Sequence, residues 1–171
     1  LGYLPQQFGY YPEFSALDFL LYISALKGLG ESTAQTKSRE LLEAVGLLKE
    51  GRRRIRTFSG GMKQRLGLAR VLAGQAELLL MDEPFASLDF LTRAELQSQL
   101  LDIQEKLPRT IVLVTHQLEE ALLLGRRIIV MHPDSTICEF DLTDLPYPRD
   151  LDDPTLRRLK EAITDQCRYT A

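Results

Sequence analysis

The sequence predicts an α/β fold with a parallel sheet at its core and a small α-helical subdomain. Two continuous apolar runs, at residues 78–81 and 110–115, are typical of fully buried strands in a parallel sheet. A helical stretch at residues 92–107 separates them, so the three segments form a strand–helix–strand unit. Two more helical patterns lie before residue 52 and predict the helical subdomain.

The remaining elements follow from caps, breakers and periodicity. In chain order we expect a strand ending at Gln6, helices at about 15–28, 32–46 and 62–73, the strand at 78–81, the helix at 92–107, the strand at 110–115, a short helix at 117–124, a strand at 127–131 with a return through 137–140, and one amphipathic helix bearing Leu156, Leu159 and Ile163. This order predicts one domain over residues 1–140, with its helical subdomain at about 13–58, followed by a charged tail at 141–171.

Composition narrows the function classes. The chain has 171 residues, 44% of them hydrophobic, which suits one domain with a real core. Its 21 Lys and Arg against 24 Asp and Glu give a net charge of −3, so charge offers no case for nucleic-acid binding. Cys138 and Cys167 lie too far apart for a zinc motif or a disulfide framework. The start at Leu1, without Met or a signal pattern, leads us to expect a fragment of a longer protein.

Two acidic residues end the first apolar run. Asp82 and Glu83 fall where a parallel sheet presents ligands, at the carboxyl end of a strand. One carboxylate can hold Mg²⁺ while the other orients or deprotonates water. Because Pro84 disfavours a helical backbone before it, Glu83 is expected to be extended. An acidic pair can also simply end a strand, and taken alone that reading is the commoner one.

A Ser-Gly-Gly segment precedes the helix at 62–73. Ser59 offers a hydroxyl, and Gly60 and Gly61 let a phosphate approach main-chain amides at the positive end of a helix dipole. An N-cap serine in a flexible turn is an equal alternative.

Two other polar residues stand at predicted strand ends. His116 can donate a hydrogen bond to a terminal phosphate, although a lone histidine is usually structural. Gln6 can bind a metal ion or water through its amide oxygen, or be an ordinary exposed amide. The arginines at 52–54 and 56 are most simply a solvated loop face.

Taken in order, these segments resemble the ABC ATPase family, a P-loop NTPase-like fold of which residues 1–140 form a part. Residues 58–65, Phe-Ser-Gly-Gly-Met-Lys-Gln-Arg, are similar to its signature motif, and residues 78–84, Leu-Leu-Leu-Met-Asp-Glu-Pro, to its Walker B segment. Ser87-Leu88-Asp89 resembles the D-loop, Gln6 the Q-loop glutamine and His116 the switch histidine.

The resemblance implies an ATPase that binds ATP and Mg²⁺ between two domains arranged head to tail. It implies that Asp82 and Gln6 serve the metal, that Glu83 is the general base and that His116 contacts the γ-phosphate. It also implies that Ser59, Gly60, Gly61 and Met62 face the partner's nucleotide and that Asp89 lies at the dimer contact. Transmembrane permease subunits are the implied membrane partners, on the cytoplasmic face of the cell membrane, and a substrate-binding protein is a further candidate; no nucleic acid is implied.

Two departures from the family pattern stand out. Met62 occupies a position where many members have glutamine, a variant that resembles exporters. The 171 residues contain no G-x-x-x-x-G-K-[ST], the loop that cradles phosphates. We therefore expect this chain by itself to hydrolyse no ATP above background.

Three functions compete on the sequence alone. The leading one is an ATP-hydrolysing subunit that powers transport; its first part resembles exporters, while residues 81–142 and Pro148-Arg149-Asp150 resemble nitrate, sulfonate or taurine importers, which favours import slightly. An ABC-type ATPase acting on nucleic acid or ribosomes is the second, using the arginine run. A truncated, non-catalytic protein is the third.

Overall fold

The computed structural model describes residues 1–6, 9–74, 76–132 and 135–168. The chain divides into two compact units, Leu1–Val114 and Thr115–Ala171, and each is described by itself. Residues 169–171 of the expected tail lie outside the described part.

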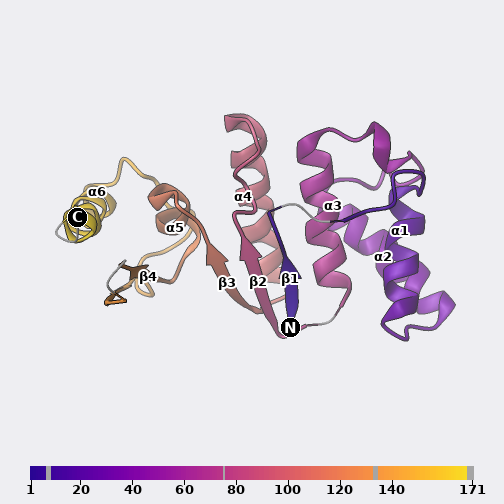
Figure 1. The fold of residues 1–171 in the computed structure, drawn as a ribbon, viewed down its shortest axis with the longest axis horizontal. Helices are drawn as coiled ribbons and strands as arrows, with labels where there is room; N and C mark the ends of the chain where they lie inside the picture. The colour runs from indigo at the N-terminus through magenta and orange to yellow at the C-terminus, as the bar shows by residue number, and fades with distance from the viewer. Residues whose placement is uncertain (7–8, 75, 133–134, 169–171) are drawn as a thin grey trace. The chain divides into compact units, whose positions relative to one another are not determined.

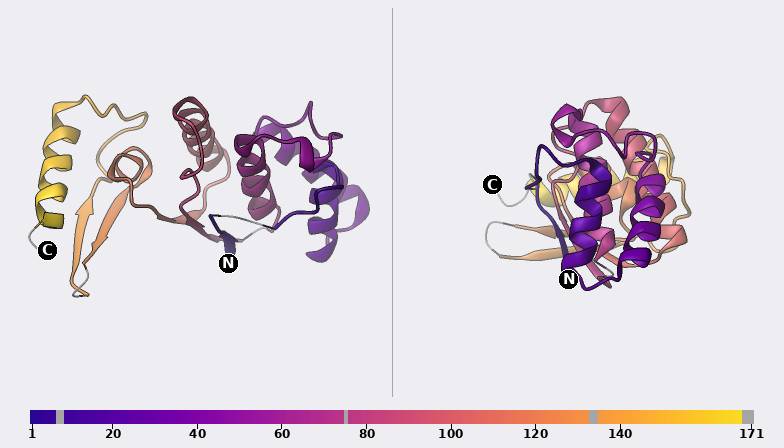
Figure 2. Two further views of the ribbon diagram at one scale, coloured as in Figure 1. Left: turned by 45° about the horizontal axis from the view of Figure 1, so that its top comes forward. Right: turned by 90° about the vertical axis from the view of Figure 1, so that its right-hand side faces the viewer.

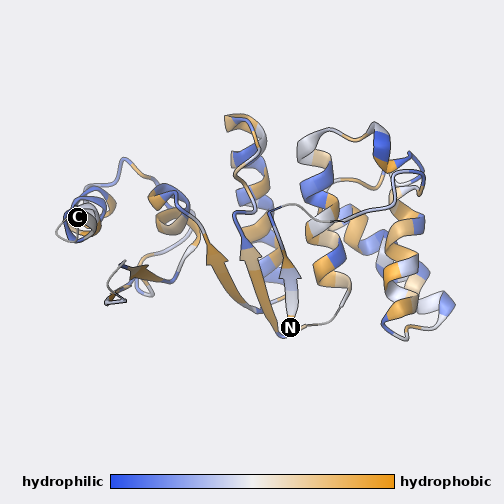
Figure 3. Ribbon diagram, in the orientation of Figure 1, coloured by the Kyte–Doolittle hydropathy of each residue, from blue (hydrophilic) through white to orange (hydrophobic). Residues whose placement is uncertain are grey.

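The first unit contains a parallel three-stranded sheet. Its strands are β1 (Gly2–Leu4), β2 (Leu78–Asp82) and β3 (Thr110–Val114), in the order β1-β2-β3. Leu4 stands opposite Met81, and Asp82 opposite Val114. Figure 3 shows β2 and β3 as strongly hydrophobic ribbons, as expected for runs of aliphatic residues. The parallel sheet predicted from those runs is therefore confirmed.

The burial of β3 differs from the sequence prediction. Both strands were expected to be fully buried, yet Leu78 of β2 is 39% exposed, and Val112 and Val114 of β3 are 47% and 48% exposed. In the described residues β3 hydrogen-bonds to β2 on one side only, and its alternate side chains point to an uncovered face. An aliphatic run cannot distinguish a strand covered on both faces from one covered on a single face.

Two long helices accompany the sheet. Helix α3 (Gly60–Ala73) packs against β1, and α4 (Phe90–Lys106) connects β2 to β3 and contacts α3. The buried side of α4 carries Leu96, Leu100 and Ile103. The sequence predicted this apolar face with Leu107 as a fourth member, but Leu107 is 46% exposed and caps the helix.

The helical subdomain consists of α1 (Ala16–Leu26), α2 (Glu31–Ala44) and the 3₁₀ turn η1 (Ile55–Thr57). The Ser15 hydroxyl accepts the Asp18 amide at 3.1 Å, so the predicted cap is present. Gly28 and Gly46 end α1 and α2 at φ 78° and 68°, which glycine adopts without steric cost. Figure 1 shows α3 lying between the sheet and this helical pair.

The second unit combines a hairpin with two helices. Helix α5 (Leu118–Leu124) leads into β4 (Arg127–Met131), which pairs antiparallel with β5 (Ile137–Asp141), and α6 (Pro154–Arg168) follows. Figure 2 shows the hairpin as two neighbouring arrows. The core of the unit is made by Leu122, Ile128, Leu142, Leu156 and Ile163.

Among the described residues, none of the helices combines the length and apolar character that a bilayer crossing requires.

Candidate functional site

Ser59 and two glycines build the N-terminus of α3. Ser59 has the extended backbone of an N-cap, with φ −65° and ψ 167°, and its Oγ atom accepts the Met62 amide at 3.2 Å. Ser59 and Gly60 are exposed, and a Cβ atom on Gly60 would meet no described atom within 4 Å. The positive end of a 14-residue helix is thus open to an anion at Gly60.

Gly61, in contrast, is buried against α4. Its neighbour there is Thr92, whose backbone amide donates to the Asp89 carboxylate at 3.1 Å. This backbone hydrogen bond, followed by one from the Thr92 hydroxyl, lowers the pKa of Asp89 below its ordinary value. Asp89 is exposed and caps α4. Gly61 and Asp89 therefore meet at one residue, Thr92.

Gln6 and Asp82, which stand at the ends of two neighbouring strands, lie at the same edge of the sheet. Leu4 pairs with Met81, so the chain leaves β1 toward Gln6 beside the point where β2 ends at Asp82. Gln6 is exposed. The Tyr3 hydroxyl donates to Asp82 Oδ2 at 3.3 Å. Desolvation and the Asp82 carboxylate raise the pKa of the Tyr3 phenol.

Glu83 adopts a left-handed backbone, with φ 47°, and the extended conformation expected from Pro84 is wrong. Its amide donates to Val114 O at 2.9 Å, and its carbonyl accepts the Ala86 amide at 3.2 Å. The first hydrogen bond ties the end of β2 to β3, and the second closes a turn over residues 83–86. Tertiary hydrogen bonding therefore overrides the local preference, at a cost of about 1–2 kcal/mol.

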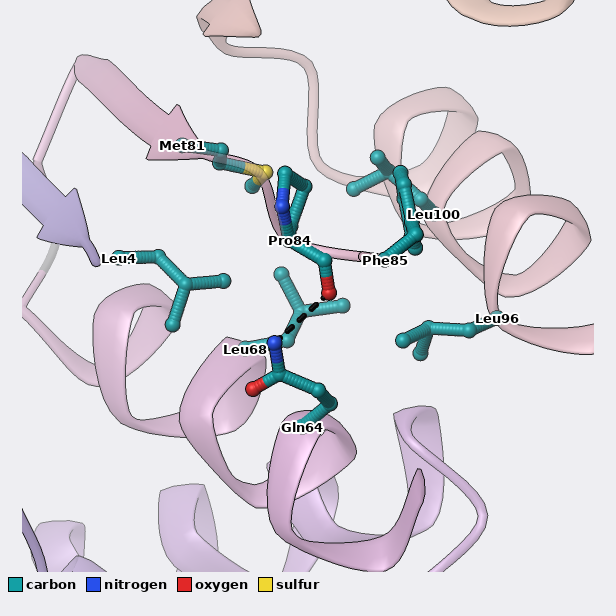
Figure 4. A pocket seen from close by; sticks show the side chains of 8 residues that line it. All are labelled: Leu4, Gln64, Leu68, Met81, Pro84, Phe85, Leu96 and Leu100. Carbon is teal, nitrogen blue, oxygen red and sulfur yellow. Dashed lines mark hydrogen bonds between the residues drawn. The ribbon is translucent and has the colours of Figure 1, made fainter. Parts of the chain in front are cut away.

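Gln64 lies within residues 58–65, the segment similar to the signature motif, but the sequence analysis gave its side chain no role of its own. It is only 6% exposed and donates from Nε2 to the Pro84 carbonyl at 2.7 Å (Figure 4). The motif does not say which residue the Gln64 side chain contacts, so only the structure places it beside the Glu83 turn.

His116 belongs to the second unit, directly before the N-cap Gln117 of α5. Its side chain is exposed. The preceding Thr115 hydroxyl donates to Glu120 Oε2 at 2.7 Å and accepts the Gln117 amide at 3.1 Å. His116 is thus placed by a well-bonded helix start.

The other end of α5 is held by Tyr147 and Arg149. The Tyr147 hydroxyl donates to Leu124 O at 2.8 Å, and its ring lies 4.3 Å from the Arg149 guanidinium carbon. Arg149 donates to four carbonyls, those of Leu122, Gly125, Leu142 and Leu145. Desolvation lowers the pKa of Arg149. The Pro-Arg-Asp tail therefore has a structural role that its sequence did not reveal.

The arginine run behaves as a solvated loop face. All four arginines are exposed, and Glu13 pairs with Arg54 at 2.8 Å and with Arg56 at 3.6 Å. Exposed pairs of this kind contribute little to stability.

The strand-end donors suit a hard cation. Asp82 supplies carboxylate oxygens and Gln6 an amide oxygen, and Mg²⁺ needs only one or two carboxylates when phosphates and water complete its shell. Within the ranges that the structure describes, no cluster of three or more His, Cys, Asp or Glu side chains forms a metal cage.

Comparison with known proteins identifies the family. The family model described as ABC transporter matches residues 1–86. The taurine import ATP-binding protein of Sinorhizobium fredii is 47% identical over 124 residues, which cover 72% of this chain and 46% of that protein. The aliphatic sulfonates import ATP-binding protein of Burkholderia lata is 38% identical, covering 85% of this chain and 56% of that protein.

A third relative is the glycine betaine/carnitine transport ATP-binding protein of Listeria monocytogenes, 40% identical over 77% of this chain and 33% of its own length. The chain thus spans about half or less of these relatives. A solved structure of an inward-facing ABC transporter, described as of the metal-chelate type, shares the fold with a TM-score of 0.73 and 23% identity, over 85% of this chain and 60% of that chain. Because the family model matches residues 1–86 and these relatives are named as ATP-binding proteins, the chain belongs to the ABC transporter family, among its ATP-binding subunits.

Proposed function

We propose that the complete protein hydrolyses ATP and thereby powers the import of a solute through an ABC transporter. The observation that carries this proposal is the end of β2, where Asp82 is the last residue of the strand and Glu83, the next residue, keeps a left-handed backbone. Costly conformations persist where the surrounding structure requires them, and they cluster at active sites. The relatives named above are import or transport proteins, which supports import.

The carboxylates divide the work. Asp82, together with the Gln6 amide oxygen, would hold Mg²⁺, which neutralises phosphate charge when it is bound. Tyr3 donates a hydrogen bond to Asp82 and so orients its carboxylate. Glu83, whose backbone is fixed by Val114 and Ala86, orients and deprotonates the attacking water. His116 donates a hydrogen bond to the γ-phosphate.

The N-terminus of α3 serves the nucleotide of a second ATP-binding subunit. Ser59 presents a hydroxyl group and Gly60 a backbone amide at the exposed start of the helix. The amide of Met62 donates to the Ser59 hydroxyl oxygen and so fixes its position. Asp89, exposed at the start of α4, lies at the contact between the two subunits. Each subunit thus contributes a different half to each ATP site.

The membrane subunit docks on the helical subdomain. A groove of about 380 Å³ lies there, lined by residues that include Tyr11, Tyr22, Leu26 and Arg70. The Tyr11 and Tyr22 rings meet edge to face at 5.5 Å, and Leu26 is 64% exposed. We infer that a short amphipathic helix of a transmembrane permease covers this groove and holds the protein at the cytoplasmic face of the membrane. A substrate-binding protein would deliver the solute to the permease.

The test is Glu83→Gln in the complete transporter. This change removes the base but keeps the size and polarity of the side chain, so steady-state hydrolysis should fall by about 10²-fold or more. ATP-driven association of the two ATP-binding subunits should persist, as measured by size exclusion with ATP and Mg²⁺. Normal turnover in this variant would refute the role of Glu83.

A second variant tests the shared site. Ser59→Arg fills the open helix start of one subunit and should abolish hydrolysis at the site of its partner. The control is Arg52→Ser, on the solvated loop face, which should leave the rate unchanged. Full activity of Ser59→Arg would exclude the site shared between subunits.

A further inference from the structure

The buried amide of Gln64 connects two motifs that stand apart in the sequence. Gln64 lies on α3, a little more than one turn after the Ser59 cap, and its Nε2 atom donates to Pro84 O at 2.7 Å. Figure 4 shows this hydrogen bond crossing from α3 to the segment after β2. The surrounding side chains are apolar: Leu4, Leu68, Met81, Phe85, Leu96 and Leu100.

This setting makes the hydrogen bond hard to replace. The residual cavity among these side chains is about 10 Å³, at the lower limit for a single water molecule. Without the Gln64 donor, the buried Pro84 carbonyl would have to find another partner or move. Loss of a buried donor is therefore felt at the position of the Pro84 peptide.

Pro84 directly follows Glu83, whose left-handed backbone is fixed on its other side by the hydrogen bond to Val114 O. The turn that carries the Glu83 carboxylate is thus held between β3 and α3. The α3 contact comes from the same helix whose start is the signature segment.

We propose that Gln64 is a positioning residue, which holds the Glu83 turn in its productive conformation and couples it to the signature helix of the same subunit. This inference rests on the proposed function of Glu83 and deepens it. A displacement of α3, caused by nucleotide at the signature segment, would reach the Glu83 turn through one hydrogen bond. Each subunit thereby links the half-site that it offers to its partner with the base of its own site.

The test compares two buried glutamines in the complete transporter. Gln64→Met removes the donor and keeps the approximate volume; Gln97→Met, on α4, is the matched control, because Gln64 and Gln97 are the two buried glutamines among the described residues. Gln64→Met should lower kcat about tenfold with KM for ATP within about twofold, while Gln97→Met keeps kcat near wild type. Both should lower the melting temperature to a similar degree.

A second variant guards against a folding defect. Gln64→Leu also removes the donor but has a different apolar shape, so it should lose kcat in the same way as Gln64→Met. Equal losses in the Gln64 and Gln97 variants, tracking their melting temperatures, would reduce Gln64 to a packing residue and overturn the proposal.

The coupling to Glu83 is tested by a double-mutant cycle. In a Glu83→Gln background, Gln64→Met should cause no further loss in single-turnover hydrolysis, since the group it positions has gone. ATP-driven association of the subunits should be unchanged. An additive loss, or impaired association, would mean that Gln64 acts through the signature segment alone. If Glu83→Gln retains normal turnover, both the proposed function and the coupling fail; if it stalls while Gln64→Met is fully active, only the coupling fails.

Discussion

A Cβ atom placed on Gly61 would stand 2.3 Å from the Cγ2 atom of Thr92. This contact joins the second residue of α3 to the third residue of α4, and only a glycine leaves room for it. The requirement is therefore steric, in addition to any closeness of phosphate to the main chain.

Gly61→Ala should destabilise the first unit by about 1–3 kcal/mol, because the added methyl overpacks a close helix contact. Urea unfolding measures the change. Adding Thr92→Ser removes the clashing methyl and should restore most of the loss. Gly60→Ala is the control, since its Cβ meets open space; it should change stability by less than about 0.5 kcal/mol. A loss at Gly61 that persists after Thr92→Ser would contradict the steric explanation.

Backbone strain at Glu83 can be separated from the loss of its carboxylate. Glu83→Gly and Glu83→Ala both remove the carboxylate, but glycine adopts φ 47° freely and alanine does not. The glycine variant should be more stable than the alanine variant by about 1–2 kcal/mol in urea unfolding. Equal stability of the two would show that the left-handed backbone carries no cost.

The Asp89 cap predicts a dependence of stability on pH. The pKa of Asp89 lies below the ordinary value of 3.8, because in the folded state the backbone amide and then the hydroxyl of Thr92 donate hydrogen bonds to the carboxylate. Between the folded pKa and that value the unfolded chain binds the extra proton, so stability rises with pH and the contribution of Asp89 is complete above this window. The stabilising contribution of Asp89 is lost as the pH falls through the pKa that this residue has in the folded state.

Asp89→Asn isolates this contribution, because asparagine caps a helix equally well without titrating. Melting temperatures measured from about pH 2.5 to 6 should show the two proteins converging as the pH falls. A difference between them that stays constant over this range would argue against the cap as its origin.

Arg149→Gln should loosen α5. One guanidinium serves four carbonyls, and a single hydrogen bond to a charged group contributes about 1.5–3 kcal/mol. Because bonds that share one donor group are not additive, we expect a loss of about 2–4 kcal/mol for the second unit. Hydrogen exchange of the amides at 118–124 reports the effect locally. Arg158→Gln, an exposed arginine on α6, is the control and should leave the exchange unchanged. Unaltered protection of α5 in Arg149→Gln would remove the role given to Arg149.

Local signals in the sequence explain how much of the fold could be predicted. Residues 127–131 form β4 as expected, and Ser15 caps α1, because a short apolar run and side-chain capping are signals carried by a few neighbouring residues. Asp82, Ser59 and His116 could be proposed as site residues because each stands at the end of an element, where its polar group has no place in the core.

What the sequence could not predict depends on distant partners. The Glu83 conformation is imposed by Val114, and the burial of Gln64 by residues from β1, β2 and α4. The exposed face of β3 could not be predicted either, because an aliphatic run shows that a strand is hydrophobic but not whether other elements cover both of its faces. The sequence places Arg149 in a charged tail, and only the structure shows that it donates to four backbone carbonyls.

The backbone at Glu83 has a consequence for protein engineering. A design procedure that ranks residues by folding energy alone would favour glycine or asparagine at this position, since both tolerate positive φ. Such a procedure would delete the carboxylate while improving every score that it computes. Residue 83 should therefore be held fixed whenever this scaffold is optimised, and the same rule identifies, in uncharacterised relatives, a non-glycine residue at positive φ after a buried strand as a position to protect.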